Sequence, residues 1–218
     1  MIDLHTHTFF SDGVLVPSEL IRRAACLGYR TIGITDHADG SNLEMVVEAA
    51  SRAAADAERH WDITVIPGVE LTHIPAPLIG EMIGEARRLG ARLVVVHGET
   101  MVEPVQDGTN RAAIRGGADI LSHPGLITAA DARAAARKGV HLEITVRKGH
   151  SLANGHVART GLDAGAPLIL GTDAHGPGDL ISREEAERVA RGAGLRPDEV
   201  RRLFSNAMKL TEKLIKGA

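Results

Sequence analysis

The chain has 218 residues, of which 44% are hydrophobic and 24% charged, and its formal net charge is −3. This ordinary globular composition can bury a substantial core, and it fits one domain over residues 1–218 better than two small ones. With no basic excess and only one Trp, one Tyr and three Phe, the composition argues against a binder of nucleic-acid polymers. The composition does not argue against a nucleotide as a small-molecule substrate.

The termini and the single cysteine bear on the cellular compartment. Cys26 has no partner for a disulfide within the chain, and we expect it to be a small buried residue in a helix. The segment MIDLHTHTFF lacks the basic region and apolar run of a signal peptide. No stretch approaches the roughly 18 consecutive apolar residues of a membrane span. These features predict a cytoplasmic protein.

Seven short apolar runs alternate with helix-like segments along the chain. The runs are aliphatic and do not alternate with polar residues, as expected for parallel strands buried on both faces. Several helix-like segments end in glycine, which can close a last helical turn in the left-handed conformation. In chain order the predicted strands are Ile2–Leu4, Thr31–Ile34, Ile63–Ile66, Leu93–Val96, Ile120–Leu121, Leu142–Ile144 and Leu168–Leu170.

Helix starts are also recognisable. A helix should follow Pro17, a long one should span Leu43–His60, and another should begin at Pro197. Ser182 and Glu185 have the spacing of a capping box. Strand–helix alternation of this kind predicts a parallel sheet, which is either a small closed barrel or an open doubly wound sheet.

Polar residues at the strand ends favour the barrel. Each predicted strand ends in a histidine, a carboxylate or both, and in a closed parallel barrel all these ends meet at one mouth. A lone histidine there is more often a hydrogen-bonded rim residue, but independent rim residues would not share one chemistry. The polar ends contain Asp3, His5, His7, Asp36, His37, Glu70, His97, Glu99, His123, Glu143, Asp173 and His175.

The histidines indicate metal binding. Alternate residues of an extended segment face the same way, so His5 and His7 can bind one ion. Six of the eleven histidines lie at or just past strand ends, together with Asp12, Glu70 and Asp173. We assign no metal to the others, which include His60, His73, His141 and His156.

These motifs, in this order, resemble the PHP (polymerase and histidinol phosphatase) family of metal-dependent phosphoesterases. The resemblance covers about four-fifths of the chain, and it implies a distorted (β/α)7 barrel, TIM-like, with up to three metal ions at the carboxyl ends of the strands. The matching pieces are His5-Thr6-His7-Thr8, Ser11-Asp12-Gly13, Ile34-Thr35-Asp36-His37, Pro67-Gly68-Val69-Glu70, Val96-His97, Ser122-His123-Pro124 and Gly171-Thr172-Asp173-Ala174-His175.

The resemblance also implies a ligand set for two to three divalent ions. One ion would bind His5, His7, Glu70 and Asp173. A second would share Glu70 and add His97 and His123, and a third would bind Asp12, His37 and His175. Imidazole and carboxylate ligands suit Mn, Zn or Fe. The complete set argues against a purely structural domain.

The ligand charges favour a phosphate substrate. Three divalent ions against three ligand carboxylates leave about +3 at the mouth, which attracts phosphate and lowers the pKa of bound water. The expected reaction is in-line attack by a metal-activated hydroxide, with Asp36 or a water as the proton donor. The candidate catalytic residues are Asp36, His37, Glu70 and Asp173.

Two connections are candidates for substrate binding. Residues 98–111 form a long connection that could lie over the site, and it contains Arg111. Arg147 and Lys148 follow the strand that ends near Glu143, and two cations beside a metal cluster fit an anionic substrate.

The preferred function is hydrolysis of a small-molecule phosphomonoester, similar to histidinol-phosphate phosphatase. The alternative is a phosphodiesterase or nuclease acting on a nucleotide or a single-strand end. An amidohydrolase also begins with His-x-His in a barrel, but it usually has eight units and a bridging lysine. A non-catalytic metal-binding module is the least favoured reading.

Overall fold

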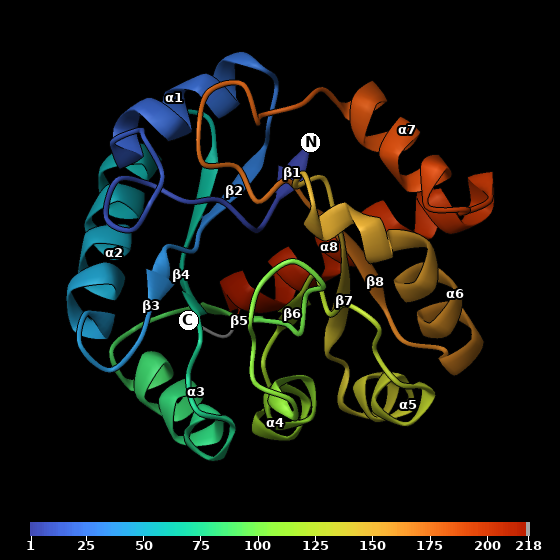
Figure 1. The fold of residues 1–218 in the computed structure, drawn as a ribbon. Helices are drawn as coiled ribbons and strands as arrows, with labels where there is room; N and C mark the ends of the chain where they lie inside the picture. The colour runs from blue at the N-terminus through green and yellow to red at the C-terminus, as the bar shows by residue number, and fades with distance from the viewer. Residues whose placement is uncertain (217–218) are drawn as a thin grey trace.

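The computed structural model describes residues 1–216 as a parallel sheet that curls into a barrel, with helices around its outside (Figure 1). Seven strands are hydrogen-bonded in sequence order, and a short strand, β3 (His37–Ala38), pairs with β4 beside this path. The seven are β1 (Ile2–Asp3), β2 (Thr31–Ile34), β4 (Thr64–Leu71), β5 (Leu93–His97), β6 (Ile120–Ser122), β7 (His141–Thr145) and β8 (Leu168–Gly171).

Eight α-helices in residues 1–216 follow or connect these strands. They are α1 (Pro17–Cys26), α2 (Leu43–His60), α3 (Ile79–Arg88), α4 (Thr109–Gly116), α5 (Ala129–Lys138), α6 (Asn154–Ala164), α7 (Arg183–Gly192) and α8 (Pro197–Lys216). Short 3-10 turns at Ala76–Leu78 and His150–Ala153 precede α3 and α6. No helix in residues 1–216 has the length and apolar character needed to cross a membrane.

Contacts between the first and last strands bring the two edges of the sheet together. Beyond the end of β1, Thr6 forms a parallel bridge with Ala174, and the amide of His7 donates to the Ala174 carbonyl at 2.8 Å. The amide of Asp173 donates to the carbonyl of His5 at 2.9 Å. The barrel is therefore nearly closed, which confirms the prediction of a distorted seven-stranded barrel over an open sheet.

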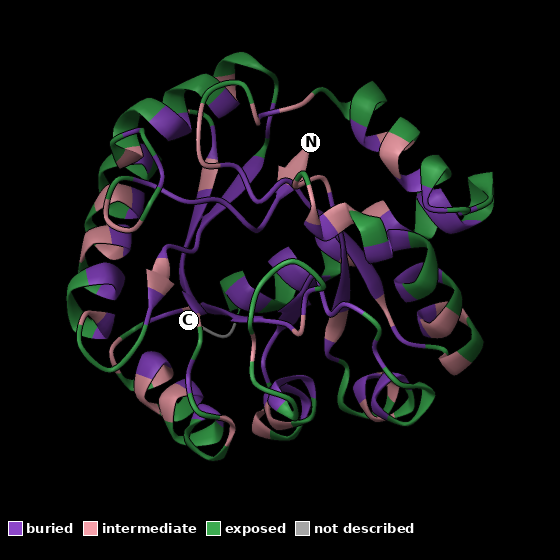
Figure 2. Cartoon of the chain, viewed as in Figure 1, coloured by how far each residue is buried: buried purple, intermediate pink, exposed green. Residues whose placement is uncertain are grey.

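Aliphatic side chains fill the barrel, and α8 covers its amino-terminal end. Leu4, Ile66 and Leu93 lie in one buried cluster with Leu210 and Leu214 of α8. Two further clusters lie between the sheet and the outer helices, and the strands are buried almost throughout (Figure 2). Because α8 covers one end, the opposite end, where the strands finish, is left for a functional site.

The predicted strands and helix starts are largely confirmed, with informative differences. β4 continues through Pro67 and Gly68 to Leu71, because Gly68 lets the backbone approach β5, where an added Cβ would lie 2.6 Å from the Leu93 carbonyl oxygen. The capping box of Ser182 and Glu185 is present at α7. The expectation of a buried Cys26 was wrong, because this last residue of α1 faces solvent.

Candidate metal centre

His5 and His7 lie on the extended segment that follows β1, on the same face. Thr6, between them, turns toward β2 and donates its hydroxyl to the Gly33 carbonyl at 2.6 Å. The two imidazole rings are 5.1 Å apart and fully buried. The alternation expected of an extended segment therefore places both histidines toward the barrel axis.

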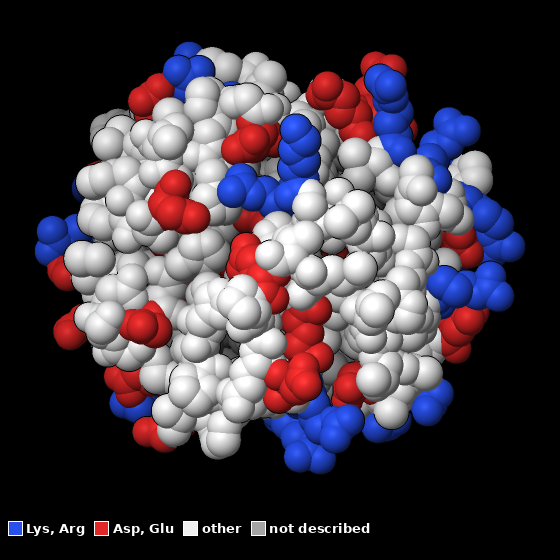
Figure 3. Space-filling view, viewed as in Figure 1, with Lys and Arg blue, Asp and Glu red and all other residues white. Residues whose placement is uncertain are grey.

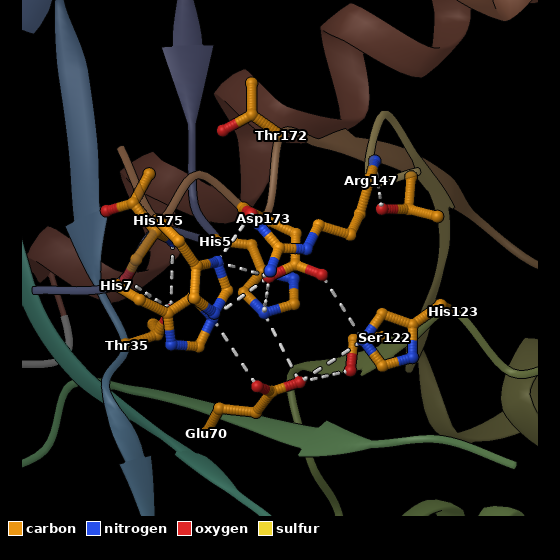
Figure 4. Close-up of polar contacts among 12 residues, drawn as sticks. His5, His7, Thr35, Glu70, Ser122, His123, Arg147, Thr172, Asp173 and His175 are labelled. Carbon is orange, nitrogen blue, oxygen red and sulfur yellow. Dashed lines mark hydrogen bonds and ion pairs between the residues drawn. The ribbon is translucent and has the colours of Figure 1, made fainter. Parts of the chain in front are cut away.

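The carboxylate of Glu70 points toward several histidines of the cluster (Figure 4). Its Oε1 is 3.3 Å from His5 Nε2 and 3.7 Å from His123 Nε2, and its Oε2 is 3.6 Å from His7 Nε2 and 2.8 Å from His37 Nδ1. This position follows from strand register, because His37 of β3 pairs directly with Glu70 of β4. The hydroxyl of Ser122 donates to Oε1 at 2.6 Å and orients the carboxylate.

Asp173 lies opposite Glu70. Its Oδ1 is 3.2 Å from His7 Nε2 and 3.8 Å from His5 Nε2, and its Oδ2 is 3.7 Å from His123 Nε2. Asp173 and His123 both have positive φ angles, 55° and 25°, which non-glycine residues rarely adopt. Backbone strain of this kind concentrates at functional sites, where the surrounding structure maintains it.

Asp12 occupies the solvent side of the cluster. Its Oδ1 is 3.0 Å from His175 Nε2 and 3.6 Å from His37 Nε2. Ligand atoms from Asp12, His37, His175 and also His7 all lie within 4.8 Å of one another, as a single ion requires. The residues that the sequence suggested for a third ion therefore come together here, with His7 beside them.

His97 has a different neighbour from the one expected. Its Nε2 lies 3.1 Å from the Oε2 of Glu103, and Glu70 is not among its ion-pair partners in residues 1–216. The ring of His97 still packs at 4.4 Å against that of His123. Glu103, which the sequence analysis did not select, is exposed in the connection from β5 to α4, where no strand-end pattern singled it out.

The buried ligand atoms suit metal ions. Nitrogens of His5, His7, His97 and His123 and the Oε2 of Glu70 are buried and accept or donate no hydrogen bond of good geometry, although Glu70 Oε2 and His7 Nε2 lie within ion-pair distance of neighbouring side chains. No Lys or Arg side chain within residues 1–216 forms an ion pair with Glu70, Asp173 or the buried Glu143. Buried carboxylates need paired charge or a coordinated metal, so these residues fit a divalent-ion cluster.

The pKa values of the histidines reflect the buried negative charge that bound divalent ions would neutralise. Burial opposes a charge on His5, but the carboxylates of Glu143, Glu70 and Asp173 outweigh it and raise its pKa well above the usual value. Burial lowers the pKa of His7 to about 4 and that of His123 well below its usual value. Neutral imidazoles are the form in which histidine binds a metal.

The carboxylates respond in the opposite direction. Burial opposes ionisation of Glu70 and Asp173, yet the neighbouring histidines, first of all His5, hold the pKa of each well below its usual value. Despite partial burial, the hydrogen bond from His175 and the charge of His37 lower the pKa of Asp12 to about 2. These carboxylates are therefore ionised at neutral pH, as metal ligands must be.

Glu143 supports the cluster from behind. It is fully buried, and its Oε1 is 2.7 Å from His5 Nδ1, while its Oε2 accepts from the His123 amide at 3.1 Å. In the neutral, metal-binding form of His5, this contact favours the proton on Nδ1 and leaves Nε2 free to face Glu70 and a metal ion. Burial raises the pKa of Glu143 despite the opposing effect of His5.

Replacing Glu143 should therefore weaken metal binding without removing a ligand. Glu143→Gln should lower metal affinity about 10- to 100-fold, as is typical when a partner behind a metal-binding histidine is lost. A chelator-competition titration of the purified variant measures this directly. Wild-type affinity in Glu143→Gln would show that His5 needs no carboxylate partner.

Asp36 is buried and its oxygens are engaged. Oδ1 accepts from the Thr8 amide at 2.6 Å and the Ser11 hydroxyl at 2.7 Å, and Oδ2 accepts from the Thr8 hydroxyl at 2.7 Å. Asp36 thus fastens the segment that carries Asp12.

The three candidate cations lie in different places. Arg147 extends toward the cluster, with one guanidinium nitrogen 3.5 Å from the Asp173 carbonyl and 3.7 Å from Asp179 Oδ2 (Figure 4). Lys148 is exposed on the same loop. Arg111 is not brought to the cluster, because it pairs with Asp131 at 3.1 Å across a hollow between α4 and α5.

The charge on the mouth face is mixed. Figure 3 shows acidic side chains over the middle of this face, while most Lys and Arg side chains lie toward its periphery and some basic side-chain atoms lie nearer the centre.

Comparisons with known proteins place the chain in a family. Residues 3–144 match the model of the PHP domain. The chain is 48% identical to an uncharacterized protein, MJ1295, of Methanocaldococcus jannaschii over 91% of this chain and 92% of that one. It is 31% identical to a probable phosphatase of Edwardsiella ictaluri over 91% of this chain and 88% of that one.

A solved structure shares the fold at lower identity. Histidinol phosphate phosphatase of Lactococcus lactis, complexed with zinc, L-histidinol and phosphate, superposes with a TM-score of 0.60 at 18% identity, covering 89% of this chain and 94% of that one.

Proposed function

Because the chain belongs to the PHP domain family, we propose that this phosphoric ester hydrolase cleaves a small-molecule phosphomonoester with the help of two to three divalent ions. The similarity to a probable phosphatase along most of both chains supports a phosphatase. The fold shared with a histidinol phosphate phosphatase makes histidinol phosphate one substrate to test.

One observation carries the proposal: buried, unpartnered imidazole and carboxylate atoms converge at the mouth of the barrel. His5, His7, Glu70 and Asp173 would hold one ion, Asp12, His37 and His175 another, and His97 and His123 would bind on the remaining side. Bound ions of this kind supply Lewis acidity and a water of lowered pKa. We propose Mn, Zn or Fe as the metal.

The protein itself supplies orientation. Glu143 holds His5 in the tautomer that faces the ions, and Ser122 fixes the carboxylate of Glu70. Asp36, the earlier candidate for the proton donor, has its oxygens occupied by Thr8 and Ser11. We propose it as a positioning residue for the Asp12 segment.

Arg147 is the proposed contact for the substrate's anionic end. Its guanidinium lies beside Asp173 and its side chain is 32% exposed, so it can reach a ligand while part of it is desolvated. A planar fork of donors suits phosphate oxygens. Lys148 would add only a point charge from a more exposed position, and Arg111 lies too far outside the cluster for this role.

Arg147→Ala should cost about 1.5–3 kcal/mol, or roughly 10- to 150-fold in kcat/KM, as for a charged hydrogen bond. Lys148→Ala should cost less. Metal content and melting temperature should stay near wild type, because residues in such loops contribute little to stability. Steady-state kinetics on the best phosphate ester measure the loss of kcat/KM, and thermal melts measure the stability of each variant. Unchanged kinetics in both variants would show that the loop is ordinary solvated surface and does not bind the substrate.

A panel of phosphate esters tests the reaction class. The metal-loaded chain should hydrolyse p-nitrophenyl phosphate faster than bis-p-nitrophenyl phosphate. The reverse order would replace the proposal with a phosphodiesterase.

A further inference from the structure

Glu103, in the connection between β5 and α4, lies next to the metal cluster although it belongs to none of the strand-end motifs of the sequence. Its Oε2 lies 3.1 Å from His97 Nε2 and 3.4 Å from His73 Nε2, and its Oε1 lies 3.4 Å from His150 Nε2. Three imidazoles from three different segments thus surround one carboxylate.

The connection is held so that Glu103 stays in this place. The Oε1 of Glu99 accepts from the amides of Gly108 and Asn110, both at 2.9 Å, which joins the two ends of the connection. The hydroxyl of Thr100 contacts His150 Nδ1 at 2.6 Å, which ties the connection to the loop after β7. Figure 1 shows the connection projecting in front of β5 and β6.

The imidazoles around Glu103 have the character of ligands. His97 is 3% exposed and its Nδ1 is buried without a hydrogen-bond partner. His73, two residues past the end of β4, has a φ of 52°, a conformation that is costly for a histidine. Its ring centre lies 5.3 Å from that of His97. Ligand atoms of His73, His97 and Glu103 lie within 4.8 Å of one another.

We propose that Glu103 and His73 bind, together with His97, a divalent cation at the rim of the barrel. The ion bound by His97 then has one ligand, Glu103, from the β5–α4 connection, in addition to the histidines at the ends of the barrel strands. Imidazole and carboxylate ligands from this set suit zinc or manganese. The inference rests on the proposed metal centre but not on the proposed reaction.

The test compares Glu103→Gln and His73→Asn with Asp107→Asn. Asp107 is an exposed acid of the same connection, so Asp107→Asn matches the loss of charge without touching the cluster. Asparagine tolerates the left-handed backbone of position 73. Metal-free protein is titrated with zinc against a chelator, and hydrogen exchange of residues 99–107 is followed with and without zinc.

Glu103→Gln and His73→Asn should each bind one ion fewer per chain, or bind it at least about 10-fold more weakly, while Asp107→Asn should match wild type. Zinc should slow exchange of residues 99–107 in wild type and Asp107→Asn but not in Glu103→Gln. A Glu103→Gln protein that titrates like Asp107→Asn would overturn the site. Zinc binding through Glu103 without phosphate-ester hydrolysis would contradict only the proposed function.

Discussion

Glu70→Gln should lose both metal and turnover. The carboxylate of Glu70 lies within ion-pair distance of four histidines, His5, His7, His37 and His123. Replacing it with glutamine removes the negative charge that these four positions share. Loss of a direct ligand should cost more than the 10- to 100-fold typical of residues behind the ligands, so kcat/KM should fall by at least about 100-fold. Elemental analysis and phosphate-ester kinetics measure the two effects.

Asp12→Asn is the matched comparison for Glu70→Gln. Within residues 1–216, the ion-pair partners of Asp12 are the outer pair, His37 and His175, and its side chain is 57% exposed. It should reduce occupancy of that outer position alone. Full metal content in Glu70→Gln, with unchanged turnover, would contradict the role of Glu70 as a shared metal ligand.

Metal loading should raise the stability of the fold sharply. Buried imidazole and carboxylate atoms without partners lose their hydration on folding, and a bound cation offsets that cost. An ion present at 100 times its dissociation constant stabilises the native state by about 2.7 kcal/mol. For a chain of this size each ion should raise the melting temperature by about 5–10 °C.

Differential scanning calorimetry of chelated and reloaded protein, with and without added zinc or manganese, measures this shift. Glu70→Gln is the control, because its smaller response would assign the stabilisation to the cluster. Equal melting temperatures with and without metal in the wild-type chain would indicate that the cluster binds no ion tightly.

The sequence predicted which site residues lie close together wherever a general rule of the fold relates a residue's place on a strand to its place in space. The carboxyl ends of parallel barrel strands converge, so the sequence alone places residues as distant as His5 and Asp173 close together. Alternation along an extended segment likewise predicted that His5 and His7 face one way. These placements need only the strand order, and the strand order of this barrel follows the sequence.

The positions of β3, Glu103 and Arg111 could not be predicted from such rules. β3 has two residues, too few for a hydrophobic pattern, although its register sets His37 beside Glu70. Glu103 lies in a connection whose path depends on Glu99 and Asn110, and no local pattern distinguishes it from other loop acids. Arg111 was placed near the site because its loop is long, but it lies on the helix that follows and pairs with Asp131.

The most direct measurement is a titration of the chelated chain with manganese or zinc, in which bound metal and p-nitrophenyl phosphate hydrolysis are followed in the same samples. Hydrolysis should be absent at the start, rise with occupancy and level off at two to three ions per chain. A metal-free chain that hydrolyses the ester as fast as the loaded chain would contradict the proposed metal-dependent phosphomonoesterase.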